Sequence, residues 1–329
     1  MDAAAVPPAD PAFHAGEQAL QARAGLRERM AEIGRTVIRD HMPDQHRELF
    51  GKLPTLLLGV QDEQGQPWAT MLHGPSGFVA SPDARTLRVQ ALPAADDPAA
   101  RWLVEGAAVG LLGLEPATRR RNRANGRVRA PHRGGFEVQV LQSFGNCPKY
   151  IHARRPEAPG PAHTAPPPAQ HLGPALNAAA IALLRRADTL FIASASAAQV
   201  GTAPGTPIGT ARSEGVDVSH RGGPAGFVHV AVGPHGLRLT LPDYPGNFFF
   251  NTLGNLIAWP RAGLLVPDHD DGSLLHLAAE AHLTHDGPAL DAFPGAQRLL
   301  HLDMREAWWR PRALPLRWSA PDAPPQFAT

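Results

Sequence analysis

The sequence predicts a mostly β protein with inserted helices, of the α+β class, in which two small β-barrels follow each other along the chain. At roughly 150 residues per domain, a chain of 329 residues has room for about two domains. Short apolar runs separated by turns rich in Gly, Pro and Asp are typical of antiparallel strands. An internal repeat indicates that the second barrel is a copy of the first.

The repeat consists of short matching segments that occur in the same order in both halves. Residues 74–79 match residues 223–228 at five of six positions. Each match precedes Leu-Arg-Val or Leu-Arg-Leu, then Leu-Pro, then a predicted helix, then Val-Gly-Leu-Leu at 109–112 or Ala-Gly-Leu-Leu at 262–265. Two antiparallel copies, each with a helix inserted between its fourth and fifth strands, favour paired barrels over a doubly wound sheet.

The individual elements follow from the spacing of apolar residues. Apolar residues at roughly helical spacing predict one amphipathic helix over residues 16–41, which Pro43 ends. The first half is predicted to contain strands at residues 53–60, 68–73, 77–80, 87–92, 107–112, 119–128 and 137–142, with a short helix at 98–105. The second half is predicted to contain helices at 177–187 and 247–259 and strands at 189–194, 217–220, 226–232, 237–241, 262–266, 274–282 and 299–309.

These elements divide the chain into four parts. They are an N-terminal helical segment at residues 1–50, a first barrel at 51–154, a linker at 155–174 and a second barrel at 175–318. The linker contains seven prolines in 20 residues. This composition favours an extended polyproline conformation and lacks the apolar residues of a core, which predicts an exposed connection between the barrels.

The charge balance argues against nucleic acid and anionic membranes as partners. Lys and Arg number 31 and Asp and Glu number 30, so a net charge of +1 creates no overall field toward a polyanion. The Arg-rich segment at 119–123 falls in a predicted strand without interleaved aromatic residues, which favours a solvated or interfacial strand. No apolar stretch approaches the ~18 residues of a membrane span.

The single cysteine, Cys147, excludes an internal disulfide and a Cys-rich zinc site. A lone thiol suits a reducing compartment, and residues 1–13 lack the basic start and apolar run of a signal peptide, so we expect a cytoplasmic protein. No metal site is predicted, because His276, His282 and His285 do not share one strand face. The sequence also has neither a Rossmann Gly-x-Gly-x-x-Gly motif nor a P-loop.

Four longer strings remain to be explained. They are Phe-His-x-Gly-Glu-x-Ala at residues 13–19, Ser-Phe-Gly-Asn-Cys-Pro-Lys-Tyr-Ile at 143–151, Asp-Val-Ser-His-Arg-Gly-Gly at 217–223 and Asp-Tyr-Pro-Gly-Asn-x-x-Phe-Asn-Thr at 243–252. Together they resemble the flavin-nucleotide-binding proteins related to pyridoxamine 5'-phosphate oxidase, in a tandem-barrel form. The resemblance covers nearly the whole chain apart from the termini and the linker. It implies the FMN-binding split-barrel fold, with FMN held between two barrels.

The second half contains the groups that a flavin phosphate needs, namely a fixed cation, free backbone N–H groups and a helix N-terminus. Arg221 follows a predicted strand and precedes Gly222, and Asn247 begins the predicted helix. In the first half Leu72 takes the place of Arg221, and residues 94–97 are acidic. We therefore expect FMN at the second barrel and a degenerate site in the first.

The resemblance implies cofactor contacts from both barrels. The second barrel would contribute Ser219, Arg221, Gly222, Asp243, Tyr244, Asn247 and Asn251, and the end of the first barrel would contribute Gln142, Ser143, Asn146 and Lys149. Several of these residues also have a purely structural explanation. Arg221 can be a surface arginine, and Asn247 and Asn251 can be a helix N-cap and part of a polar stripe. Asp243 and Tyr244 can belong to a turn, and Lys149 can be a solvated lysine after a proline. Cys147 is interpreted as a small structural thiol, because no Cys/His/Asn arrangement is visible.

The function implied by the resemblance is an FMN-dependent oxidoreductase of unknown substrate, with NADH or NADPH as a candidate electron donor. FMN would carry the hydride or the electrons, and no side chain can be named as an essential acid or base. Two other functions stay open at this stage. One is a non-catalytic flavin-binding protein, and the other is a haem-binding or haem-degrading split-barrel protein. The sequence also leaves open whether two chains form a homodimer.

Overall fold

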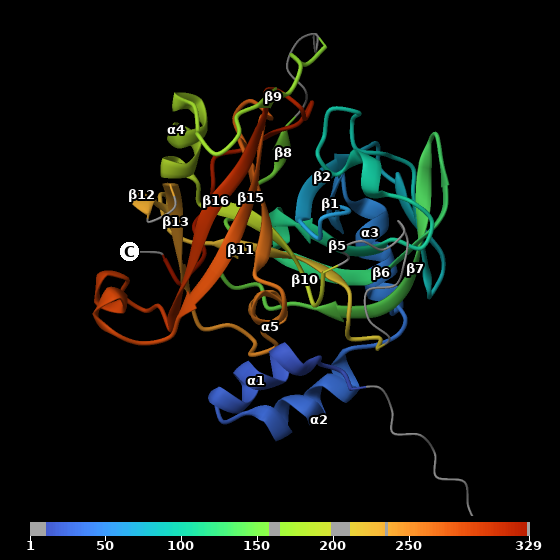
Figure 1. Ribbon diagram of the computed structural model, residues 1–329. Helices are drawn as coiled ribbons and strands as arrows, with labels where there is room; N and C mark the ends of the chain where they lie inside the picture. Colours follow the sequence, from blue (N-terminus) through green and yellow to red (C-terminus); the bar gives the residue numbers. More distant parts are fainter. Residues whose placement is uncertain (1–10, 158–164, 199–210, 234–235, 328–329) are drawn as a thin grey trace, which may run out of the picture.

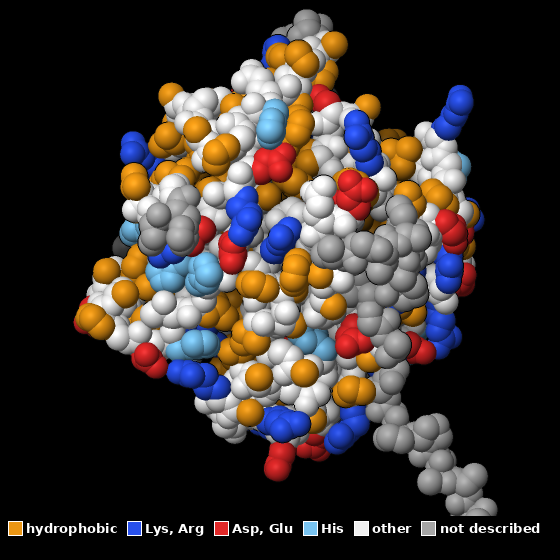
Figure 2. Space-filling view, in the orientation of Figure 1, with side chains coloured by type: hydrophobic (Ala, Val, Ile, Leu, Met, Phe, Trp, Pro, Cys, Tyr) orange, Lys and Arg blue, Asp and Glu red, His pale blue; other side chains and the backbone are white. Residues whose placement is uncertain are grey.

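The computed structural model of the chain describes residues 11–157, 165–198, 211–233 and 236–327. Two antiparallel sheets lie side by side, and helices α1 (Ala15–Arg23) and α2 (Arg27–Val37) pack at one end of the molecule (Figure 1). The α+β class and the two tandem barrels predicted from the sequence are confirmed. Figure 2 shows basic and acidic side chains interspersed over one face, which agrees with the net charge of +1.

The first sheet has seven described strands in the order β2-β1-β5-β6-β7-β4-β3. The strands are β1 (Thr55–Gln61), β2 (Pro67–His73), β3 (Val79–Asp83), β4 (Thr86–Val89), β5 (Ala108–Glu115), β6 (Arg120–His132) and β7 (Gly135–Gly145). Helix α3 (Asp44–Lys52) covers this sheet and contributes Phe50 to its core, where Leu56 and Phe136 are also fully buried.

The second sheet follows the path β11-β10-β14-β15-β16-β13-β12 in the described residues. Its strands are β10 (Thr189–Ala195), β11 (Val216–Gly222), β12 (His229–Gly233), β13 (Gly236–Asp243), β14 (Arg261–Pro267), β15 (Leu274–Thr284) and β16 (Arg298–Arg310). Helices α4 (Ala178–Arg186) and α5 (Asn251–Ala258) pack on it, and Leu184 and Leu256 join its core. Short 3-10 turns complete the chain at η1 (Ala100–Trp102), η2 (Pro116–Thr118) and η3 (Pro288–Ala292).

The two sheets have the same strand order, since each strand of the first corresponds to the strand numbered nine higher in the second. The two barrels contact each other at two equivalent places, and in each a glycine of one barrel lies against a strand of the other. A Cβ added to Gly110 of β5 would lie 2.7 Å from the Cα of Asp217, and one added to Gly263 of β14 would lie 2.8 Å from the Cα of Trp68. Asp217 and Trp68 hold equivalent places in β11 and β2. The glycine of each Gly-Leu-Leu segment is therefore required for close approach of the two barrels.

The single helix predicted over residues 16–41 is wrong. The chain forms α1 and α2 instead, and they are separated at Gly25, whose φ of 68° lies in the left-handed region that ends helices. The apolar stripe continues through both helices, so its spacing hides the break. Pro43 ends no helix, because it is the N-cap of α3, which the sequence analysis missed.

Both inserted helices and strand β12 begin later than predicted. The inserted helix of the first half is only the 3-10 turn η1, and the inserted helix of the second half begins at Asn251, because Phe250 has a φ of 59°. Strand β12 begins at His229, since residues 223–228 form a turn in which Phe227 donates its backbone N–H to Pro224.

The described ends of the predicted linker are paired with strands of the protein. Strand β8 (Pro156–Glu157) pairs with β17 (Arg317–Trp318), and β9 (Gln170–His171) pairs with β16. Residues 158–164 lie outside the described residues, and the division into four parts stays a prediction. Within the described ranges, no helix combines the length and apolar character needed to cross a membrane.

Candidate functional site

A cavity between the two barrels has a volume of about 950 Å³, including the part that is open to solvent. The first barrel contributes residues of β6 and of the segment that follows β7. The second contributes the end of β11, the segment between β13 and α5, and the first turn of α5. Neither barrel forms this cavity by itself.

The cavity brings together most of the residues proposed as cofactor contacts. Its lining includes Ser219, Arg221, Gly222, Asp243, Tyr244, Asn247 and Asn251 from the second barrel and Asn146 and Lys149 from the first. Gln142 and Ser143 are not part of this lining, because both lie within β7 and the cavity begins after that strand ends. Gln142 lies beside a second small cavity, and the fully buried Ser143 forms a hydrogen bond of 2.9 Å between its Oγ and Nδ1 of His46.

Positive charge dominates the lining. Four basic residues line the cavity, namely Arg121, Arg123, Lys149 and Arg221, against one carboxylate, that of Asp243. Burial, followed by the nearby charge of Arg123, lowers the pKa of Arg121 to about 10, so its guanidinium stays charged at neutral pH. Arg121 donates from Nε and Nη2 to the carbonyl oxygen of Cys147, at 3.1 and 2.8 Å. This carbonyl therefore holds the guanidinium at the cavity wall.

Arg123 joins the first barrel to the second. Its Nη1 lies 3.0 Å from Oδ1 of Asp217, its Nη2 donates to Oγ of Ser219, and its side chain is only 3% exposed. Asn125 and Asn255 also donate to the Asp217 carboxylate, at 2.6 and 3.1 Å. The buried ion pair is therefore compensated by amide donors from both barrels. The sequence predicts a solvated or interfacial strand at residues 119–123, and a spacing of two residues places Arg121 and Arg123 on one strand face. Nothing in the sequence indicates that this face lines a cavity.

Arg221, the expected phosphate anchor, is already paired within the protein. Its Nη1 lies 2.7 Å from Oδ1 of Asp243, and Nε of Arg298 lies 3.2 Å from the other carboxylate oxygen. Arg298 also stacks over the Phe250 ring, 4.8 Å from its centroid. An anion bound by Arg221 must therefore share this guanidinium with Asp243.

Several buried nitrogen atoms of the lining have no acceptor among the described residues. They are Nε of Arg123, Nδ2 of Asn146, Nε2 of His220 and Nε of Arg221. Burial, and next the charge of Arg121, holds the pKa of His220 well below 6.5, so this ring is neutral at pH 7. Leaving such groups without a partner costs stability, and buried polar groups are normally paired. A ligand rich in acceptor oxygens would satisfy them.

Aromatic rings form the other part of the wall. Tyr150 and Tyr244 have ring centroids 5.5 Å apart, and Phe327 near the C-terminus lies 5.5 Å from each. The backbone φ angles of Tyr150, Phe248 and Phe250 are 66°, 61° and 59°, values that residues other than Gly rarely adopt. Strained backbone of this kind tends to gather at ligand sites, and these three residues all line the cavity.

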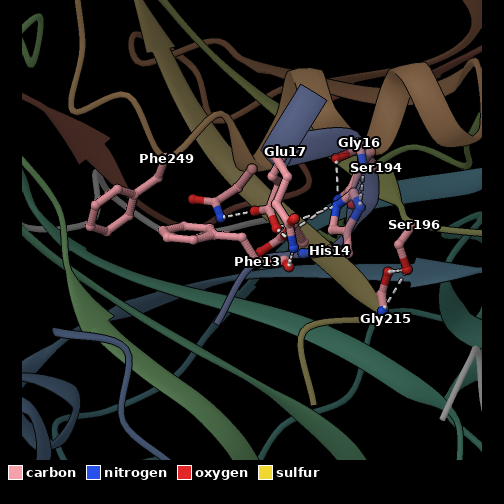
Figure 3. A network of polar contacts seen from close by, with 12 residues as sticks. Phe13, His14, Gly16, Glu17, Ser194, Ser196, Gly215 and Phe249 are labelled. Atoms are coloured by element: carbon pink, nitrogen blue, oxygen red, sulfur yellow. Dashed lines mark hydrogen bonds and ion pairs between the residues drawn. The ribbon is translucent and has the colours of Figure 1, made fainter. Parts of the chain in front are cut away.

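Helix α1 supports the cavity wall from behind. Glu17 is 3% exposed, and its carboxylate accepts hydrogen bonds from the backbone N–H of His14 at 2.9 Å and from Nδ2 of Asn251. Figure 3 shows His14 and Glu17 side by side in this buried polar network. A Cβ on Gly16 would lie 2.2 Å from the carbonyl oxygen of Gly254, so glycine permits α1 to touch α5. These contacts explain the Phe-His-x-Gly-Glu string.

Neither a protein-family model nor a curated protein matches the sequence. Among solved structures, the chain is similar to a candidate pyridoxamine 5'-phosphate oxidase from Lactobacillus delbrueckii, with 14% identity, a TM-score of 0.29, and coverage of 42% of this chain and 98% of the other. A variant of HupZ from Group A Streptococcus has 7% identity and a TM-score of 0.26, with coverage of 38% and 92%. An FAD-binding protein from Mesorhizobium loti has 12% identity and a TM-score of 0.23, with coverage of 43% and 97%. At these scores we base the function on this chain's own geometry.

Proposed function

We propose that this protein binds FMN in the cavity between its barrels and acts as an FMN-dependent oxidoreductase. The observation that carries the proposal is the excess of basic side chains and unpartnered nitrogen donors in a cavity that also has aromatic walls. A phosphate ester joined to a planar ring system offers anionic oxygens, further acceptors and a flat apolar surface. FMN combines these features in one molecule.

The phosphate is assigned to Lys149 and Arg221. Among the described residues Lys149 has no ion-pair partner, so its ammonium can pair with a ligand without breaking an existing contact. Arg221 has an unpartnered Nε besides its pairing with Asp243. Gly246 has no atom within 4 Å of the position a Cβ would take, which leaves its backbone accessible to an anion.

The flavin ring is assigned to the aromatic side of the cavity. Burial raises the pKa of Tyr150 and of Tyr244, so both phenols stay protonated at neutral pH. The Tyr150 hydroxyl donates to the carbonyl oxygen of Pro245 at 2.8 Å, which fixes this ring across the mouth between the barrels. When bound, FMN would supply the hydride or electron chemistry, while the chain's residues bind it, orient it and limit water.

The visible absorption spectrum of the purified protein tests this proposal first. A broad flavin spectrum, released as FMN on denaturation, supports it, whereas a sharp Soret band would indicate the haem alternative, with His220 as the histidine of the cavity wall. A colourless protein that does not bind added FMN would contradict both. Anaerobic reduction by NADH or NADPH then separates an oxidoreductase from a non-catalytic flavin-binding protein.

Assembly and stoichiometry belong to the same proposal. One complete cavity is formed within one chain, so titration of apo-protein should saturate near one FMN per chain. A homodimer remains part of the proposal, and sedimentation of the holoprotein tests it. Saturation at two equivalent FMN molecules per chain would contradict the asymmetry between the barrels.

A further inference from the structure

The positions that form the cavity occur a second time at the interface between the barrels, with the roles of the two barrels exchanged, and the strand registers identify them. Leu112 pairs with Arg123 in the first sheet and Leu265 pairs with His276 in the second, so His276 takes the place of Arg123. His73 ends β2 and Gly222 ends β11, and each pairs with the first residue of the neighbouring strand. Thr70 and Ser219 each lie three residues before these ends, so Thr70 is the counterpart of Ser219.

Arg310 is the third counterpart. It pairs with Leu274 at the end of β15 and β16. At the equivalent place in the first sheet, Asn146 donates its backbone N–H to the carbonyl oxygen of Arg121 at 3.2 Å. Arg310 therefore corresponds to Asn146, and the set Thr70, His276 and Arg310 corresponds to three residues that line the FMN cavity. We call this set the second anion site.

A carboxylate of the chain itself lies at the centre of the second anion site. Asp97 is 5% exposed, and its Oδ2 accepts from Oγ1 of Thr70 at 2.6 Å and from Nη1 of Arg310 at 2.8 Å. Its other oxygen accepts from the backbone N–H of Ala99 at 2.9 Å. Nε2 of His276 lies 3.8 Å from Oδ2 of Asp97.

The neighbouring charges show a site built around an anion. Asp96 accepts two further hydrogen bonds from Arg310, from Nε at 3.3 Å and from Nη2 at 3.0 Å, so two carboxylates share this guanidinium. His276 has no exposed surface, and its Nε2 has no hydrogen-bond partner in the described residues. Nδ1 of His276 lies 2.9 Å from the carbonyl oxygen of Ala69, which can only accept, and burial lowers the pKa of this ring. The neutral ring therefore carries its proton on Nδ1, and its Nε2 faces Asp97 with a lone pair. The groups that donate to the Asp97 carboxylate are Thr70, Arg310 and the backbone N–H of Ala99.

We propose that the interface between the barrels retains a second oxyanion-binding site for carboxylates and phosphate oxygens, and that the side chain of Asp97 occupies it as an internal ligand. The loop of residues 94–97 then supplies the anion that the second barrel must take from a bound molecule. Leu72 at the place of Arg221 removes one cation, and Asp97 neutralises the remaining charge. This accounts for the difference between the two equivalent sites without any change in strand order.

Chemical rescue tests the proposal without flavin. Asp97→Ala removes the internal anion and leaves Arg310 buried with Asp96 as its remaining partner, so the Tm should fall by on the order of 10 °C. Sodium formate should then raise the Tm of this variant in a saturable manner, because formate can take the place of the carboxylate. Formamide, which has the same shape and no charge, should not raise it. Wild-type protein in formate measures the general effect of the salt.

Asp188→Ala is the matched control variant. Asp188 is also buried beside an arginine and a histidine, with Nη2 of Arg154 at 2.7 Å and Nδ1 of His152 at 3.5 Å. It lies outside the repeated site, and among the described residues no hydroxyl group donates to it as Thr70 donates to Asp97. Formate should therefore raise the Tm of Asp188→Ala by less than half as much as that of Asp97→Ala. In the double variant Asp97→Ala/Thr70→Val, formate should bind at least 5-fold more weakly than in Asp97→Ala.

Two results would overturn the inference. One is an Asp97→Ala protein whose Tm responds equally to formate and formamide, and the other is equal rescue of Asp97→Ala and Asp188→Ala. If Asp97→Ala does not fold in buffer alone, the same comparison of formate with formamide is made on the refolding yield. Because no flavin is present, a wild-type protein that fails to bind FMN would refute the proposed function and leave this test intact.

Discussion

Glu17, in the first turn of helix α1, accepts a hydrogen bond from the side-chain amide of Asn251, which lines the cavity between the barrels. The two residues are 234 positions apart in the chain. Because Nδ2 of Asn251 donates to Glu17, its oxygen is left to face other partners. Glu17 thus orients a cavity residue without lining the cavity itself.

Glu17→Ala should weaken FMN binding roughly 5- to 20-fold, because Asn251 loses the acceptor that orients its amide. Glu17→Gln keeps an amide oxygen for Asn251, so its Kd should stay within about 3-fold of wild type. Glu28→Ala, at an exposed position of α2, is the control and should have no effect. Flavin fluorescence titration measures all three. Equal Kd values for wild type and Glu17→Ala would remove the orienting role.

Glu17 should also make stability depend on pH. Burial, and next the charge of Asp217, raises the pKa of Glu17 well above 4.5, so the folded state holds this proton more tightly than the unfolded state. The free energy of unfolding of wild type should therefore decrease relative to Glu17→Gln as pH rises above about 4.5, until the raised pKa is passed. Urea unfolding of both proteins between pH 4 and pH 8 measures this difference. A difference that is constant across that range would show that the pKa is not raised.

Arg221→Ala should weaken FMN about 10- to 150-fold, since a hydrogen bond to an ionised group is worth about 1.5–3 kcal/mol. Riboflavin lacks the phosphate and should lose almost nothing from the same change. Arg88→Ala removes an arginine that is 48% exposed and paired with Glu137, and it serves as the control. Equal losses for FMN and riboflavin would mean that Arg221 supports the fold through Asp243 and not the phosphate.

Lys149→Ala should weaken FMN about 10-fold through loss of a charge-assisted contact, with little change in Tm. The chain has only two lysines, and the other, Lys52, is exposed at the end of α3. Lys52→Ala is therefore a matched control, and its Kd should equal that of wild type. Calorimetric titration at low and at physiological salt measures both, and the Lys149 effect should be larger at low salt. Identical Kd values for the two variants would remove Lys149 from the site.

Arg123→Met should destabilise the whole protein by roughly 3–5 kcal/mol, because it leaves the buried carboxylate of Asp217 without its cation. Adding Asp217→Asn to this variant should recover part of the loss, since the uncompensated charge is then removed. Urea unfolding of the two single variants and the double variant measures the coupling. Strictly additive losses would show that Arg123 and Asp217 do not act as a pair.

The candidate site could be predicted only in part. Arg221, Gly222 and Asn247 lie in the cavity as expected, because turns and strand ends are specified by a few adjacent residues. Gln142 and Ser143 lie outside it, since the end of β7 at Gly145 sets where the cavity begins. That boundary depends on pairing with β6, which a short segment does not encode.

The sequence by itself determined the repeat and most of the strands along the chain, because apolar alternation and turns are local properties. The tertiary structure decided which charged groups meet. Asp97 pairs with Arg310 across 213 residues, and Arg123 reaches Asp217 in the opposite barrel. Alternation along a strand tells which face of the sheet a side chain occupies. The partner that this side chain meets is set by how the two barrels pack against each other. Distances of about 3 Å then decide whether a charged group is paired within the protein or left for a ligand.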